Sequence, residues 1–507
     1  MFEKIVTAIK RGLVRIGLIK EINSLIEHKE LMVNEQAYNR IRKNKDIYNG
    51  YHKEWHHIDY LNSVGDTKTR DMVRLGMGKV VAHEMASLIF NERVQVDVNT
   101  RGYEGDNDEV AEFIQNVLND NGFYKNFQRY YEYCMALSGM AIKVYHHDGK
   151  IKLAWASADS FFPLGNDSET IDEAVFVTEE QKDGKYYTLL EWNTWEGDTY
   201  VVRNELYESK DKGKLGVKVP LSKIYENLQE VTKIDGLSRP LFVYIKPNTA
   251  NNKDINSPLG ISIYENAYDT LYSLDYLYDF LMNEFKLGVR RIAVEPSMLK
   301  SLPKYNDMRQ VIGMTQAFDT DETVFTGIAG EGDGIKDLTV SLRVDEIVQA
   351  INTQLEILSM QTGLSAGTFT FDGKTVKTAT EVVSENSKTY KTKNSHEQLV
   401  AEGIKELITT IIDVASLYEL IPMTDVDVSI SFDDSIAQDR DKNLEYYSMM
   451  VNMDMIPLVE AIQRVANVNE DTARKWLEER RKEKALAMQP IQSHEVDMFN
   501  IAPNDME

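Results

Sequence analysis

A serine motif, two histidine pairs and a glycine–lysine step come closest to reactive sites in this sequence. The run GLSAG at residues 363–367 matches the G-x-S-x-G nucleophile elbow, with Ser365 as the nucleophile. That motif works when a strand delivers the serine into a sharp turn and a helix follows directly. Here a helical pattern precedes Gly363 and a glycine-punctuated stretch follows it. We therefore expect no catalytic serine.

The histidines do not form a metal-ligand pattern. His83 and Glu84 begin like H-E-x-x-H, but Ser87 stands where the second zinc ligand belongs. The histidine pairs at 56–57 and 146–147 are adjacent in sequence. Neighbouring residues of a regular helix or strand point in different directions, so such a pair does not aim at one ion. We expect no bound metal and no cofactor.

The phosphate-loop and calcium-loop patterns also fail at defined positions. Gly76–Lys79 resembles the end of a phosphate loop, but Val73 and Val80 replace the glycine and the hydroxyl residue that the motif requires. The acidic residues between Asp319 and Asp333 do not have the spacing of an EF-hand loop. We interpret them as a solvated acidic rim, and we expect no ATPase site in the chain.

One basic segment remains as a candidate contact for a polyanion. Five lysines lie between residues 374 and 396, against Glu381 and Glu385. These lysines are Lys374, Lys377, Lys388, Lys391 and Lys393. Two interpretations stay open: a solvated helix start, or a loop that makes weak and reversible contacts with phosphates.

Two helical patterns lie immediately before this loop. Apolar residues recur every seven positions from 264 to 285: Tyr264, Leu271, Tyr278 and Phe285. Such heptad spacing predicts a helix that lies beside other near-parallel helices. A second apolar stripe runs through residues 344–362 and includes Val344, Ile351 and Leu358. Short strands are predicted between the two patterns, at 290–295 and 323–326, so we expect two packed helices that carry a small β insert.

The segment after the loop predicts a very long helix. Thr378 and Glu381 match a capping box, and about 40 helical residues follow, roughly 60 Å if unbroken. Phe432–Gln438 interrupts the pattern, and three shorter helices are predicted between Arg440 and Lys484. The acidic, proline-containing end is typical of a loose tail.

The first half of the chain predicts helices followed by an antiparallel sheet. Met72–Phe90 has a broad apolar helical face. The steps Asp148-Gly149 and Asp183-Gly184 predict tight reversals between alternating strands. Residues 248–260 are rich in Asn, Pro and Gly and have the composition of a linker. The fold class is therefore α+β.

Composition excludes several classes of function. The chain has 507 residues, a net charge of −24 and one cysteine, Cys134. A chain this acidic repels duplex DNA over most of its surface, so any contact with nucleic acid must be local and weak. The sequence has no apolar run of the roughly 18–20 residues that span a bilayer, so we expect no membrane span. Met1–Lys20 is basic and amphipathic, and we interpret it as a docking helix, with a membrane-surface helix as the alternative.

Taken in order, these parts resemble a portal protein of tailed bacteriophages, of the siphovirus type found in Gram-positive hosts. Five phrases carry the resemblance: KVVAHEMASLIFNE at 79–92, ADSFFP at 158–163, NNKDINSPLGISIY at 251–264, LGVRRIAVE at 287–295 and KTATEVVS at 377–384. The similarity covers nearly the full chain. No single phrase is diagnostic, and the specificity comes from their order.

The resemblance implies a multi-domain portal fold with a helical stem, a small β-containing clip, an α+β wing and a helical crown. Its parts would be the wing at 1–256, stem helices at 257–285 and 344–362, the clip at 286–343, the tunnel loop at 363–378, a long wing helix with a return strand at 379–435, the crown at 436–485 and a flexible tail at 486–507.

The resemblance also implies roles for residues. The stem helices would line a channel through Tyr264, Leu271, Tyr278, Val344, Ile351 and Leu358. The tunnel loop would approach DNA through Ser365, Thr368, Phe369, Lys374, Thr375 and Lys377. The clip would dock partners through Arg290, Arg291, Asp319, Asp321 and Glu322.

The implied assembly is a ring, usually of about twelve copies, at one vertex of the viral head. The implied partners are the terminase large subunit (the packaging ATPase), a head-tail adaptor, the major capsid and scaffolding proteins, and double-stranded DNA that passes through without tight or specific binding. The protein would be assembled in the host bacterial cytoplasm and remain in the virion.

Two other classes stay open at the level of sequence. A divergent metal-dependent nucleic-acid-processing enzyme would need clustered carboxylates, and the group from Asp319 to Asp333 is its candidate. A membrane pore-former would use Met1–Lys20.

Overall fold

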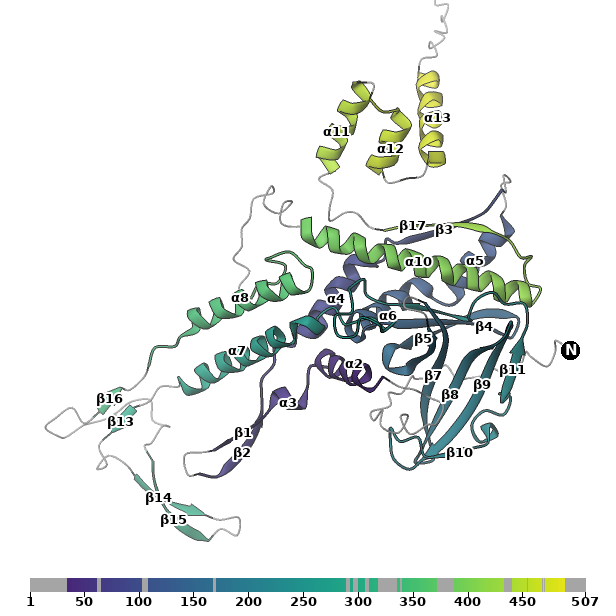
Figure 1. The fold of residues 1–507 in the computed structure, drawn as a ribbon. Coiled ribbons are helices and arrows are strands. Elements are labelled where there is room, and N and C mark those ends of the chain that lie inside the picture. Colours follow the sequence, from purple (N-terminus) through teal and green to yellow (C-terminus); the bar gives the residue numbers. More distant parts are fainter. Residues whose placement is uncertain are drawn as a thin grey trace, which may run out of the picture. The chain divides into compact units, whose positions relative to one another are not determined.

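The computed structural model describes the chain except for residues 1–33, 62–64, 103–107, 167–169, 289–291, 295–299, 306–309, 318–334, 338–339, 372–386, 433–439, 454, 467, 469 and 488–507. Its internal contacts divide the chain into two compact units, Met1–Asp433 and Asp434–Glu507. The larger unit contains the sheets, the paired helices and the long helix (Figure 1).

The larger unit begins with short helices packed around one apolar core. They are α2 Glu35–Tyr48, α3 Lys53–His56, α4 Met77–Ile89, α5 Glu109–Asp120 and α6 Phe123–Leu137. Asn34 and Asp108 cap α2 and α5 by accepting hydrogen bonds from the N–H groups of Ala37 and Ala111. Part of the apolar face predicted for residues 72–90 becomes the buried face of α4, which packs on α6. The helix begins only at Met77, and Val73 and Val80 are exposed.

Antiparallel strands follow, as the Asp-Gly steps predict. They are β4 Met140–His147, β5 Lys150–Ser157, β6 Phe161–Asn166, β7 Ile171–Lys182, β8 Lys185–Glu196, β9 Thr199–Ser209, β10 Val217–Val219, β11 Val231–Ile234 and β12 Phe242–Ile245. Asp148, Gly149, Asp183 and Gly184 all have positive φ, which is the backbone that two-residue hairpin turns need.

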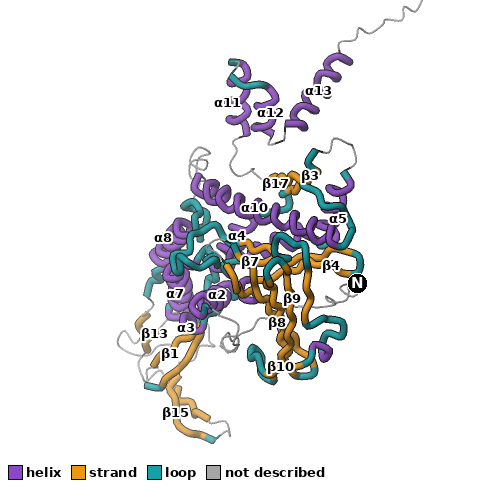
Figure 2. Tube along the Cα trace, turned by 45° about the vertical axis from the view of Figure 1, so that its right-hand side comes forward, coloured by secondary structure: helices purple, strands orange, loops and turns teal. Residues whose placement is uncertain are grey.

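These strands form two sheets. One has the order β10-β9-β8-β7-β6, with β11 also on β9, and its strands lie side by side in Figure 2. The other has the order β12-β4-β5. Short 3₁₀ turns lie at Ala158–Ser160 and Leu221–Lys223. The predicted α+β class is confirmed.

Of the strand pairs outside these sheets in the described structure, two involve the early strands β1 to β3. β1 His57–Leu61 and β2 Thr67–Asp71 form a hairpin between α3 and α4. β3 Gln95–Thr100 pairs with β17 Val426–Ser431, far along the chain. The second pairing brings the chain back beside β3 after its longest helix.

The paired helices are α7 Tyr268–Leu287, preceded by a 3₁₀ turn at Glu265–Ala267, and α8 Val344–Gln361. Between them lie β13 Ile292–Val294 paired with β16 Ile335–Asp337, and β14 Lys300–Tyr305 paired with β15 Val311–Ala317. The predicted helix–insert–helix order is confirmed. The strand predicted at 323–326 lies outside the described residues.

The long helix α10, Ser387–Leu417, packs on β12, β4 and α4. Its apolar side buries Val400, Ile404, Leu407 and Ile411. Gly403 is required there, because a Cβ at this position would lie 2.8 Å from the Ile245 side chain of β12. The capping box predicted at 378–381 lies outside the described residues.

The second unit contains α11 Arg440–Asn452, α12 Leu458–Ala466 and α13 Glu470–Ala487. α12 contacts both of the other helices. Among the described residues of this unit, only Ala461 and Ala473 are buried. The three predicted helices are confirmed.

Candidate functional site

Helices α7 and α8 lie side by side and run antiparallel (Figure 1). A polar contact joins them at each end. At one end the Thr270 hydroxyl donates to Gln361 Oε1 at 2.8 Å. At the other end the Arg343 guanidinium pairs with the Glu284 carboxylate at 3.1 Å. Both ends of the pair are therefore held in a single register.

Part of the predicted heptad set forms the seam between these helices, whereas Phe285 is 47 % exposed and lies outside it. Leu271, Ile351 and Leu358 are at most 3 % exposed. Tyr278 and Val344 are half-buried and pack against the same core. The seam therefore joins α7 to α8, and the surface that the pair offers to its surroundings is made by other residues.

Tyr264 differs from its expected place in the stem. Helix α7 begins at Tyr268, not at residue 257, and Tyr264 precedes it with no exposed surface. Its hydroxyl donates to the backbone oxygen of Asn44 on α2 at 2.8 Å. This tertiary contact holds the tyrosine in the wing core, so it cannot line a channel in this conformation.

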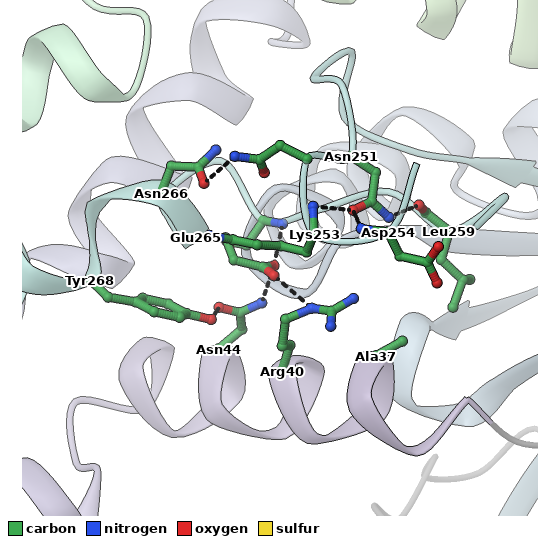
Figure 3. Close-up of polar contacts among 12 residues, drawn as sticks. Ala37, Arg40, Asn44, Asn251, Lys253, Asp254, Leu259, Glu265, Asn266 and Tyr268 are labelled. Atoms are coloured by element: carbon green, nitrogen blue, oxygen red, sulfur yellow. Dashed lines mark hydrogen bonds and ion pairs between the residues drawn. The ribbon is translucent and has the colours of Figure 1, made fainter. Parts of the chain in front are cut away.

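A buried carboxylate fixes the start of α7 to α2 (Figure 3). Glu265 pairs with Arg40 at 2.9 Å and accepts hydrogen bonds from the Asn44 amide and the Ser262 N–H. The Tyr268 hydroxyl donates to the Asn44 side-chain oxygen. The buried charge of Glu265 is stabilised because each contact supplies a hydrogen-bond donor, either to the Glu265 carboxylate or to the Asn44 amide that binds it.

The supposed linker at 248–260 belongs to the same packed region. Asn251 accepts from the N–H groups of Lys253 and Asp254 and donates to the Leu259 oxygen (Figure 3). Pro258 and Leu259 are buried. The linker interpretation was wrong. The asparagine side chains here form hydrogen bonds to the backbone of a tight turn, and the segment is not a free chain.

Two aspartates of α7 anchor the hairpin side of the wing, and sequence reasoning missed both. Asp275 accepts from the N–H groups of Leu75 and Gly76, at 2.7 and 3.0 Å, and from His56 Nε2 at 3.1 Å. Because the His52 N–H donates to His56 Nδ1, the proton of this imidazole lies on Nε2. The only sequence signal was a pair of acids four residues apart on a largely apolar helix.

Asp279 is the second anchor. It receives both guanidinium nitrogens of Arg70 at 2.7 Å, together with the Val73 N–H and the Asn283 amide. Burial by itself would raise the pKa of Asp279, but the Arg70 and Val73 hydrogen bonds outweigh it, so the pKa lies below the usual value. The base of the β1–β2 hairpin is thereby tied to the middle of α7.

The start of the tunnel loop is clamped to α10. Ser365 is 4 % exposed, its N–H donates to Thr389 Oγ1 at 2.8 Å, and the two hydroxyls are hydrogen-bonded. Thr392 Oγ1 donates to the Gly363 oxygen, and Gly363 has φ +82°, with room for no Cβ against Thr392. Ser365 therefore does not face solvent, contrary to its expected place beside DNA.

Beyond Ser365 the loop turns outward. Thr368 is exposed, and its hydroxyl donates to the Ser365 oxygen. Phe369 is half-buried against the core. The Phe371 ring lies edge-on to Tyr278 of α7, which ties the loop to the stem. Lys374, Thr375 and Lys377 lie outside the described residues.

The lysines on α10 divide into different environments. Lys393 is 1 % exposed and pairs with Glu397 at 2.6 Å. Lys388 donates to the Met360 oxygen at the end of α8, where helix carbonyls lack partners. These two contacts are structural, and Lys391 remains exposed.

The outer surface of the helix pair is acidic on one helix and aromatic on the other. Asp345, Glu346 and Glu356 are exposed on α8. Tyr272 and Tyr276 are exposed on α7 by 39 % and 51 %. The predicted docking residues of the clip (Arg290, Arg291, Asp319, Asp321 and Glu322) lie outside the described residues.

Two properties of the described residues bear on the other classes of function. No group of three or more His, Cys, Asp or Glu side chains there could hold a metal ion. No described helix is long and apolar enough to cross a bilayer.

The chain thus combines an α+β region, an antiparallel helix pair with a β insert, a clamped loop, a long helix and a separate helical unit. The sequence matches, over residues 27–485, the family described as "Phage portal protein, SPP1 Gp6-like". Because the match spans most of the chain, the protein belongs to this family of structural phage proteins and is a component of the virion.

Two further comparisons were made. No curated protein matches the chain in sequence. A chain of the solved structure "Neck of empty GTA particle computed with C6 symmetry" has 10% sequence identity and a TM-score of 0.40, and the alignment covers 77% of this chain and 89% of that chain.

Proposed function

We propose that about twelve copies of this chain form a closed ring at one vertex of the capsid, and that viral double-stranded DNA enters and leaves through its centre. The phage is of the siphovirus type with a Gram-positive host, and the ring is assembled in the host cytoplasm. The chain supplies the conduit, and a separate ATPase supplies the work.

The observation that carries the proposal is the α7–α8 pair. Its apolar seam is buried between the two helices. The outer surface of the pair can therefore face a channel or a neighbouring copy. The exposed carboxylates Asp345, Glu346 and Glu356 suit a channel wall, because like charge repels phosphates and keeps DNA from binding. A ring of twelve such chains carries roughly −290 charges, which reinforces the same repulsion.

The tunnel loop is the proposed site of brief DNA contact. Thr368, Lys374, Thr375 and Lys377 follow the clamped start of the loop, and lysines give weak contacts that salt reverses. Phe369 packs against the hydrophobic core beneath the loop and so anchors it. Ser365 has no part in this contact because it is buried.

The β insert between the stem helices is the proposed docking surface. Its basic pair, Arg290 and Arg291, and its acidic residues from Asp319 to Glu322 would bind the terminase large subunit first and a head-tail adaptor later. The wing and the second unit would meet the major capsid and scaffolding proteins.

Electron microscopy of the purified full-length protein tests the proposal. We expect rings with a central channel wide enough for B-form DNA. Monodisperse monomers at every concentration examined would contradict it. Incubation of the same preparation with duplex DNA and Mg²⁺ should leave the DNA uncut, whereas metal-dependent cleavage would favour the enzyme alternative.

A further inference from the structure

A groove runs between strand β12 and helix α10 in the larger unit. Its volume is about 550 Å³, enough for several apolar side chains. Its floor includes Phe242, Val243 and Ile245 of β12, each only 3 % exposed, and its wall includes Leu399, Glu402 and Glu406 of α10. β12 is the edge strand of its sheet, so no further strand covers the groove on that side within the described structure.

Three carboxylates and two cations line the groove: Asp172, Glu402 and Glu406 against Arg239 and Lys246. Arg239 also lines the groove, but its nearest carboxylate is Asp413, at 3.1 Å. Among the described residues, no basic side chain forms an ion pair with Glu402 or Glu406. Burial raises the pKa of Glu406, and Glu402 raises it further, while Arg239 opposes both. A cationic occupant would relieve this repulsion.

The chain itself contains a segment of matching chemistry. Met1–Lys20 carries five basic residues against one acid, in a protein whose net charge is −24. At helical spacing, Ile5, Ile9, Leu13 and Ile16 share one side of this segment. An amphipathic helix of this kind binds by laying its apolar side in a groove while its charged rim pairs with the walls.

The point where the described chain begins is close to the groove. The Asn34 side chain donates to Asp254, whose N–H donates to the Asn251 side chain. In the same segment, the Pro258 oxygen accepts a hydrogen bond from Lys246, which lines the groove. A 20-residue helix is about 30 Å long, and the residues that follow it could span roughly 40 Å if extended. This length of chain gives the segment a reach of roughly 40 Å from the start of α2.

We propose that Met1–Lys20 docks in the β12–α10 groove of its own chain, with its isoleucines and leucine on the β12 floor and its basic residues beside Glu402 and Glu406. The inference does not depend on ring formation, because all of its parts lie in one chain. It assigns a binding partner to a basic segment that channel formation leaves without a role.

Zero-length carbodiimide coupling of the wild-type, full-length protein tests the proposal. We expect amide cross-links from Lys4, Lys10 or Lys20 to Glu402, Glu406 or Asp172, read by peptide mass spectrometry. Coupling of these lysines only to carboxylates elsewhere, or no coupling, would overturn the proposal. In a mixture of ¹⁴N and ¹⁵N protein, cross-links that join the two isotopes would move the segment to a neighbouring copy and overturn docking within one chain.

Tryptic cleavage after Arg11 and Arg15 gives a second readout. Glu402→Gln with Glu406→Gln should speed this cleavage several-fold, because the docked segment loses its charged partners. Glu226→Gln with Glu230→Gln changes the net charge equally on residues that do not line the groove, and should leave the rate unchanged. Equal cleavage rates in the wild type and the groove variant would contradict docking.

Discussion

The guanidinium of Arg70 and the carboxylate of Asp279 form a two-pronged ion pair, with both N–O distances at 2.7 Å. Arg70 lies on strand β2 and Asp279 lies in the middle of α7. The pair therefore joins the wing hairpin to the stem. Because Asp279 is nearly buried, removing its charge should weaken the attachment of β2 to α7.

Asp279→Asn should destabilise the protein by about 2 kcal/mol, because Arg70 and the Val73 N–H lose their charged acceptor. Thermal unfolding at pH 7 measures the effect. Asp269→Asn, an exposed change on the same helix, is the control and should leave the midpoint unchanged. The pKa of Asp279 is depressed, so its contribution is present above the ordinary carboxyl pKa near 3.8 and fades as the pH falls below that value. An equal loss in both variants would argue against the anchor.

Acidification should weaken the contact between α10 and the segment after β12. His396 accepts a hydrogen bond from the Asn248 N–H at Nδ1, and burial lowers its pKa to about 4. Since an unfolded histidine titrates near 6.5, stability is full above that pH and falls as the pH drops from about 6.5 towards 4, by up to about 3 kcal/mol.

His396→Gln should flatten this part of the pH profile, because glutamine does not titrate. Urea unfolding of both proteins between pH 7 and 4 gives the comparison. A variant that keeps the wild-type slope over this range would assign the slope to other groups.

Thr389→Val should loosen the start of the tunnel loop. The substitution keeps the shape of the side chain but removes the acceptor of the buried Ser365 N–H, at a cost of about 1–3 kcal/mol, while the Thr389 N–H still donates to Ser365 Oγ. Hydrogen exchange at residues 363–371 should rise. Thr409→Val is the matched control, since the Thr409 hydroxyl bonds only to the Lys405 oxygen of its own helix. Unchanged exchange in the Thr389 variant would show that the clamp does not hold the loop.

Reversal of charge on α8 should convert a repelling wall into a binding one. Glu346→Lys with Glu356→Lys should tighten binding of the ring to duplex DNA by roughly tenfold at low salt, an advantage that disappears as salt rises. Fluorescence anisotropy at several salt concentrations measures it. Glu226→Lys with Glu230→Lys makes the same change in net charge elsewhere. If both variants bind DNA equally, the α8 surface does not face the channel.

Shortening the loop after Phe371 should spare assembly and impair DNA packaging or retention. The residues up to Phe371 contact α7, α8 and α10, so a deletion confined to 372–378 leaves these contacts in place. Ring formation by electron microscopy and packaged DNA per particle are the two readouts. Collapse of the ring would show that this part of the loop is structural.

The regular spacing of apolar residues made the paired helices predictable. Where α7 begins depends on contacts with residues far away in sequence, and these could not be predicted. The heptad repeat identified Leu271 as a seam residue because a repeat fixes one side of a helix. It could not place the start of α7, because Tyr264 is held by Asn44, far away in sequence.

The same limit applies to the candidate site. Ser365 looked accessible in a glycine-rich run, and its burial depends on Thr389 in the following helix. The anchors Asp275 and Asp279 find their partners some 200 residues away, as with Leu75 and Arg70. Such pairings cannot be predicted from the sequence around each residue.

The position of the two aspartates on α7 has a mechanical consequence. Successive helical residues are about 100° apart, so Asp275 lies about 40° around α7 from Leu271, on an adjoining side, and Asp279 lies about 160° from Leu281. One side is fixed to α8 by apolar packing, and another is fixed to the wing by charge. The helix can neither roll nor slide without breaking one attachment. It acts as a strut, so a push on the β insert is carried into the wing and is not absorbed in the stem.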